Sequence, residues 1–258
     1  MKHIFNPPVY RLDWKKGDDS MNEYERMIQE EVDIWRSDIL KRSSLLNRLS
    51  KKAQRKINEV IPEKVHHVVT ESIKNMVKAT LVGSNFITKK KDGVFSLFEM
   101  DEQVKQKINT YQKTAALEGA GTGAGGIFLG LADFPLLLSI KMKFLFEAAS
   151  IYGFDTNEYE ERLFILHVFQ LAFSSDEKRK EIFRVIEDWE SHKQELTDVD
   201  WRMFQQEYRD YIDFVKLLQL VPGIGAVVGA YANYNLLEHL GNVTMNCYRL
   251  RILKIGER

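Results

Sequence analysis

The sequence predicts an all-α protein, a multi-helix bundle with two glycine-rich apolar helical segments packed in its centre. Three observations predict this class. Apolar residues recur at intervals of three and four along most of the 258 residues, whereas strand-like alternation between turn residues is nearly absent. The chain has only five prolines, which disfavour helix interiors. Its composition, 44% apolar and 29% charged, is that of a globular chain able to bury its own core.

The chain is expected to form one domain. Residues 1–20 are predicted to be an N-terminal arm, and residues 21–258 a single helical domain. Prolines and charges interrupt the arm, which is therefore not expected to be a secretory signal. The single cysteine, Cys247, cannot form an internal disulfide and fits a reducing cytoplasm. Basic and acidic residues balance at 37 each, so nucleic acid is not expected as a partner.

Four helices are predicted before the first glycine-rich segment. Asp and Ser residues at 18–20 are candidate caps for an amphipathic helix. A basic amphipathic helix over 43–61 stops at Pro62, because proline disfavours helix continuation. The third helix has a valine- and isoleucine-rich face and weakens or ends at Gly83. The fourth is mostly polar and covers 99–118.

Helices are also predicted through the rest of the chain. The first apolar segment continues helically to Gly153, a suitable C-cap. A helix restarts after the Asp, Thr and Asn residues at 155–157, and two charged amphipathic helices follow over 174–196 and 198–220. A second uncharged run, 217–237, then leads into a closing helix.

The segment 118–140 contains six glycines, and after its first residue Asp133 is its only charge. Gly121, Gly123 and Gly126 satisfy the G-x-G-x-x-G pattern of dinucleotide-binding loops. That pattern requires a strand before it, whereas here a helical pattern precedes it. No Gly-Lys-Ser/Thr is present for a phosphate-binding loop. Nucleotide binding is therefore the least favoured interpretation, and no cofactor is expected.

Membrane contact and close helix packing remain the two alternatives. Both glycine-rich segments reach the roughly 20 residues that cross a bilayer. Asp133 and Pro135 in the first, and Gln219, Asn233 and Asn235 in the second, favour a peripheral or half-inserted hairpin over a full crossing. Glycines four residues apart instead let helix backbones touch, either in a soluble core or between membrane helices. These pairs are Gly119/Gly123, Gly121/Gly125, Gly126/Gly130 and Gly225/Gly229.

The same segments resemble the bacterial EcsC family, which is named for its genetic association with an ABC transporter. The resemblance rests on "EGAGTGAGGIFLGLADFPLLLSI", on "IYGFD" followed by "EYEERLFIL", and on "VPGIGAVVGAYANY". It extends from about Trp35 to the C-terminal helix. Positions that match the family pattern include Gly119, Gly121, Gly125, Gly130, Asp133, Pro135, Tyr152, Gly153, Asp155, Pro222, Gly225 and Gly229.

This resemblance implies a membrane-associated accessory protein of a transport or secretion system. Membrane lipid or ABC transporter components would be its partners, and the inner face of the cell membrane its peripheral location in the cytoplasm. The resemblance carries no accepted catalytic residues, so the protein is expected to be non-enzymatic. Lys141 and Lys143 follow the first apolar run directly and suit a cytoplasmic membrane surface.

Asp133 is the leading candidate for a functional side chain. A carboxylate in an apolar run must be paired, hydrogen-bonded or neutral, which could create an acidic pocket with Glu118 or Glu147. A hydrolase-like or lipid-modifying enzyme is the alternative function that such a pocket would support. Asp133 also stands two residues before Pro135, so a helix N-cap is the simpler explanation.

The remaining candidates give no further chemistry. Asp155 joins the candidates through its match to the family pattern. His66 and His67 are adjacent and so lie on different sides of a helix, and no histidine pair has the spacing of a metal site. We therefore expect no metal. Cys247 has no neighbouring histidine and is expected to face a helix core.

Overall fold

The computed structural model describes residues 22–41, 63–83, 86–88, 93, 95–122, 134–174, 176–197 and 229–256. Every regular element in these ranges is a helix, which confirms the all-α class. The predicted arm 1–20 and the predicted helices over 43–61 and 198–220 lie outside the described residues. The helices are α1 (Glu23–Leu40), α3 (Glu63–Val82), α4 (Leu97–Thr122), α6 (Phe134–Ile151), α7 (Tyr159–Phe173), α8 (Asp176–Glu187), α9 (Trp189–Thr197) and α12 (Gly229–Gly256).

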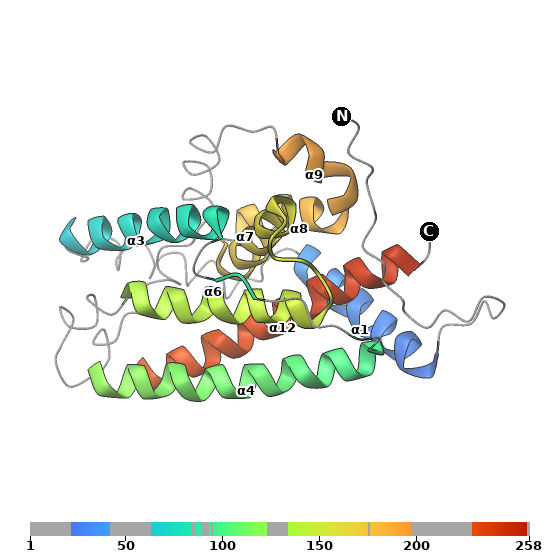
Figure 1. Cartoon of the computed structure of the whole chain (residues 1–258), viewed down its shortest axis with the longest axis horizontal. Helices are drawn as coiled ribbons and strands as arrows, with labels where there is room; N and C mark the ends of the chain where they lie inside the picture. Colours follow the sequence, from blue (N-terminus) through green and yellow to red (C-terminus); the bar gives the residue numbers. More distant parts are fainter. Residues whose placement is uncertain are drawn as a thin grey trace.

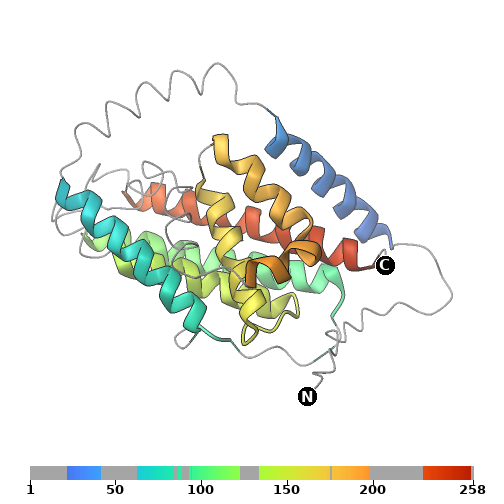
Figure 2. The same ribbon diagram turned by 90° about the horizontal axis from the view of Figure 1, so that it is seen from above.

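The bundle is organised around α4, α6 and α12, which lie side by side (Figure 1). Among the described helices, α4 and α12 make the most extensive contact. Helix α3 packs on α6 and α7, and α1 packs on α12 and α8. Seen from above, α1 and α3 lie on opposite sides of the bundle (Figure 2). Buried aromatic and aliphatic side chains of α6 and α7 fill much of the core between these layers.

Local sequence accounts for three of the helix ends, namely the start of α1 and the ends of α3 and α6. Helix α1 begins with a capping box in which Asn22 accepts from the backbone of Glu25 and the Glu25 carboxylate accepts in return. The cap of α1 is therefore Asn22, whereas the predicted Asp and Ser candidates at 18–20 lie outside the described residues. Gly83 and Gly153 follow α3 and α6 with φ of 78° and 84°, conformations that favour glycine.

The predicted helix over 174–196 is divided in two at Asp188. The backbone carbonyl of Asp188 accepts from the amides of Ser191 and His192 and so starts the first turn of α9. Trp189, the first residue of α9, is buried against Phe164 at a centroid distance of 5.0 Å. Amphipathic periodicity alone did not show this break, because the charges of both helices continue on their outer faces.

Helices α4 and α12 run antiparallel, and their register is set by two contacts. Arg249 bonds to Asp101 near one end, and Gly241 meets Ile108 farther along. Continuing this register brings the start of α12, at Gly229, level with the last turn of α4 (Figure 1). The described ends of the two glycine-rich segments therefore lie at one end of the bundle.

Gly241 allows the close approach of α12 to α4. A Cβ added at Gly241 would lie 2.6 Å from both Cδ1 and Cγ1 of Ile108. This glycine was not among those singled out in the sequence, since it stands in an ordinary helical run. Close packing through a missing side chain thus occurs between these two helices, at a position outside the glycine-rich segments.

We expect Gly241→Ala to lower the free energy of unfolding by about 1–2 kcal/mol, because overpacking outweighs the better helix propensity of alanine. In an Ile108→Ala background the clash is gone, and the same substitution should become stabilising. Urea denaturation of the wild type, the two single variants and the double variant measures the change in free energy of unfolding in each background. Equal effects of Gly241→Ala in the two backgrounds would show that Ile108 does not limit the helix separation.

Candidate functional site

A cluster around Asp101, on α4, joins four other side chains inside the bundle. Asp101 is fully buried and accepts from the hydroxyls of Tyr24 at 2.7 Å and Tyr152 at 2.6 Å. The guanidinium of Arg249 donates to the same carboxylate at 3.0 and 2.9 Å and also reaches Glu31 at 3.1 Å. We call these residues the Asp101 cluster. It ties α1, α4, α12 and the end of α6 to one carboxylate.

A second cluster repeats this arrangement around Glu161, on α7. Tyr248 donates to its buried carboxylate at 2.6 Å, and Arg251 donates to its other oxygen at 2.6 Å. Arg251 also lies 3.4 Å from Glu190 of α9, which pairs with Lys193 at 2.9 Å. We call these residues the Glu161 cluster. It ties α7, α9 and α12 together.

The two clusters meet through stacked tyrosines. The rings of Tyr152 and Tyr248 lie 5.2 Å apart and nearly parallel, at 20°. Arg249 and Arg251 stand two residues apart on α12, so the helix turn directs them to different sides and each serves one carboxylate. The core of this end of the bundle is consequently a pair of carboxylate–arginine–tyrosine units, joined by one aromatic stack.

The pKa directions follow from burial and pairing. Burial raises the pKa of Glu161, while Arg251 and Tyr248 act to lower it. Burial raises the pKa of Tyr152 and Tyr248, and the neighbouring carboxylates raise it further. Burial alone would lower the pKa of Arg249, but the hydrogen bond and charge of Asp101 raise it above its ordinary value.

Both clusters hold helices together rather than offer reactive groups. The carboxylates of Asp101 and Glu161 are engaged by arginine and tyrosine donors. Cys247 is buried, as predicted, and burial raises its thiol pKa well above the ordinary value. Burial lowers the pKa of the His167 imidazole to about 4. Within the described ranges, no group of three or more metal-ligating side chains occurs.

Lys141 is the exception to this pairing. It lies on α6, its side chain is 0% exposed, and Nζ has no hydrogen-bond or ion-pair partner among the described residues. Burial lowers the pKa of its amine from 10.5 to about 7. Lys143, two residues on, is exposed. The expectation that both lysines lie at a membrane surface is therefore wrong for Lys141, because two residues turn a helix by about 200°.

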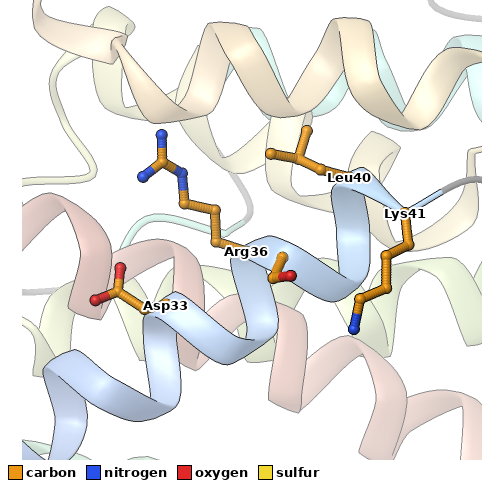
Figure 3. Close-up of a pocket in the computed structure, with 5 residues that line it drawn as sticks. Asp33, Arg36, Leu40 and Lys41 are labelled. Carbon is orange, nitrogen blue, oxygen red and sulfur yellow. The ribbon is translucent and has the colours of Figure 1, made fainter.

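A hollow of about 520 Å³ lies along the second half of α1. Its lining consists of Asp33, Arg36, Ser37, Leu40 and Lys41. In Figure 3, Arg36 and Leu40 project toward the helix that lies alongside α1, whereas Lys41 projects away from it. Arg36 forms an ion pair with Glu187 of α8. The hollow is open to solvent, and the guanidinium of Arg36 is already paired with the carboxylate of Glu187.

Comparison with known proteins gives the family. The model of the EcsC protein family matches residues 26–253. The chain belongs to the EcsC protein family. It is 58% identical over 235 residues to Protein EcsC of Bacillus subtilis (strain 168), an alignment that covers 91% of this chain and 98% of the relative. It is 32% identical over 156 residues to the uncharacterized protein YdbA of the same organism, covering 59% and 57% of the two chains. No solved structure matched.

This assignment confirms the resemblance noted from the sequence. None of the described helices of this EcsC family protein is long and apolar enough to cross a membrane. Tyr152 and Gly153, both matched to the family pattern, have structural roles. Tyr152 belongs to the Asp101 cluster, and Gly153 ends α6.

Glu147, one of the predicted acidic candidates, is bound to α4. Glu147 accepts from Tyr111 at 2.9 Å and pairs with Lys107 at 2.8 Å, both on α4. From Phe134, where α6 begins, to Glu147 the helix rises about 20 Å at 1.5 Å per residue. Glu118 lies in the last part of α4, two turns beyond Tyr111. Glu147 is thus held away from the start of α6, next to which Asp133 stands in the sequence.

The other predicted positions divide between described and undescribed residues. Asp155 accepts from the backbone and side chain of Asn157 at 2.9 and 2.8 Å, which makes it a turn residue. Pro135 is exposed in the first turn of α6, and Gly119, Gly121 and Gly229 are helical. Asp133, Gly123, Gly125, Gly126, Gly130, Pro222 and Gly225 lie outside the described residues.

Sequence reasoning missed the residues that the structure brings together. Asp101, Glu161, Arg249 and Arg251 look like ordinary charges of amphipathic helices, and no local pattern marks them as buried. Lys141 could have been found, because it lies three and four residues from apolar neighbours on both sides. Those neighbours, all buried, are Leu137, Leu138, Phe144 and Leu145.

Proposed function

We propose that this EcsC family protein is a non-enzymatic accessory protein of a bacterial transport or secretion system. It works at the inner face of the cell membrane and contacts lipid or a membrane partner through its two glycine-rich apolar segments. The observation that carries this proposal is the antiparallel register of α4 and α12. It brings the described ends of the two segments, at Gly121 and Gly229, to one end of the bundle.

The glycine content of the two segments also supports this end of the bundle as the region that contacts lipid or a membrane partner. Each glycine in a helix costs about 1 kcal/mol relative to alanine, so a run of them requires a compensating contact. The EcsC resemblance adds the association with an ABC transporter as a context for that contact. The opposite end of the bundle, where the two charge clusters fasten α1, α7, α9 and α12, supplies the rigid base.

The test compares Gly125→Leu with the wild type in flotation with vesicles of anionic phospholipid and in fractionation of gently lysed cells. We expect the wild type to float with the vesicles and to sediment with membranes. Gly125→Leu should lose most of this partitioning while its circular dichroism and thermal unfolding stay close to wild type. Asn109→Leu, which adds the same side chain at an exposed position of α4, is the control and should behave as the wild type.

Two results would count against the proposal. A wild-type protein that stays wholly in the supernatant and ignores vesicles has no membrane contact. A Gly125→Leu protein that unfolds would instead assign the glycines to core packing, and the partitioning of the wild type would then need another surface.

A further inference from the structure

Lys141 differs from every other buried charged side chain of the described residues. Asp101, Glu161 and Arg249 each have an ion-pair partner inside the bundle. Lys141 has none among those residues, although its side chain is as deeply buried. A buried ammonium without a counter-charge is costly, and a neutral amine without an acceptor also loses its hydrogen bonds to water. Among the described residues, Lys141 is thus a buried cation without an acid.

The neighbours of Lys141 along α6 are apolar. The residues three and four positions away on either side are buried leucines and a phenylalanine, and Ala148, seven positions on, is also buried. Helix α6 is packed by α3, α4, α7 and α12. An acid that reached Lys141 would therefore have to bring an apolar body with it. An inorganic anion alone would lose its hydration without replacing it.

We propose that Lys141 is the internal cation of a binding site for an acidic lipid, a molecule with one carboxylate or phosphate group on a hydrocarbon chain. The head group would form a charge-assisted hydrogen bond with Nζ, and the chain would contact the apolar side chains of the inner face of α6. This inference rests on the proposed function, because it names a lipid as the partner. The proposed site lies inside the bundle and holds one lipid molecule, separately from the contact with the membrane surface.

Carboxylate and phosphate head groups can both accept a hydrogen bond from the Lys141 amine. The experiment therefore tests one lipid of each kind. Delipidated full-length protein is titrated with hexadecanoate, with hexadecyl phosphate and with the uncharged hexadecanol, and binding is followed by calorimetry and by the shift in melting temperature. We expect at least one of the two acids to bind and hexadecanol to bind at least about tenfold more weakly. The tighter of the two acids identifies the head group.

Lys141→Met removes the cation and keeps the length of the side chain. It should weaken binding of the preferred acid by about tenfold to a hundredfold, the loss of one charge-assisted hydrogen bond. Lys143→Met is the matched control, because Lys143 is exposed on the same helix, and it should change the affinity by less than about twofold.

Three results would overturn the proposal. The first is equal binding of hexadecanol and the acids, and the second is equal affinity of Lys141→Met and wild type. The third is a ligand-free Lys141→Met protein that melts at a lower temperature than wild type, since an acid of the chain itself would then be the partner of Lys141. Vesicle flotation of the wild type separates this failure from that of the proposed function. A wild type that floats with vesicles but fails these binding tests contradicts only the internal site, whereas a wild type that does not float contradicts the proposed function.

Discussion

Asp101→Asn is expected to lower the free energy of unfolding by about 3–5 kcal/mol, the usual cost of breaking a buried ion pair by removing one partner. The substitution keeps the size of the side chain but leaves one oxygen, so only one of the hydroxyls of Tyr24 and Tyr152, which bond to different oxygens of Asp101, keeps its acceptor. It removes the negative charge that faces Arg249, which is 7% exposed at its side chain. Arg249 would retain only Glu31, whose carboxylate is 51% exposed and therefore a weak partner.

Chemical denaturation at pH 7 measures this loss. Glu102→Gln is the matched control, because Glu102 is the next residue of α4 and pairs with Lys105 near the surface. It should change stability by no more than about 0.5 kcal/mol. An Asp101→Asn protein as stable as the wild type would mean that hydrogen bonds, and not the charge of Asp101, hold Arg249 in place.

Lys141→Met is expected to do the opposite and raise the free energy of unfolding of the ligand-free protein by on the order of 4 kcal/mol at pH 7. Burial lowers the pKa of Lys141 to about 7, whereas the amine of the unfolded chain titrates near 10.5. Folding at neutral pH therefore requires the amine to lose a proton or to bury its charge. Methionine fills the same space without this cost.

The pH dependence gives a second measurement of the same effect. Between about pH 7 and pH 10.5 the unfolded chain holds a proton on Lys141 that the folded chain has released, so this residue makes wild-type stability rise with pH. The Lys141→Met protein lacks this pH-dependent contribution to stability. The gap between the two proteins should be widest at pH 7 and below and should close toward pH 10.5. A gap that does not change with pH would show that packing, not ionisation, separates them.

The two substitutions differ because Asp101 has its charge partner within the bundle, whereas Lys141 has none among the described residues. The Asp101 and Glu161 clusters are complete, so their charges are accounted for by their contribution to structure. Lys141 is expected to destabilise the ligand-free fold, and groups of that kind are found at functional sites more often than elsewhere.

Helix periodicity predicted the class and most of the elements of this EcsC family protein. The helix ends at Gly83 and Gly153 followed from local sequence, because glycine adopts a positive φ without steric cost. The cap at Asn22 and the break at Asp188 were missed. Several polar residues near each end could serve as caps, and packing of Trp189 against Phe164 decided the break.

The amino-acid sequence by itself thus determined the all-α class, the family and the helix ends at Gly83 and Gly153, since these show in residues close together along the chain. Only the tertiary structure decided which buried charges meet. Arg249 and Asp101 are separated by 148 residues, and Tyr248 and Glu161 by 87. Helical periodicity relates residues within a few turns, whereas partners so far apart are brought together only when the helices pack in a fixed register. The same packing left Lys141 buried without an acid among the described residues.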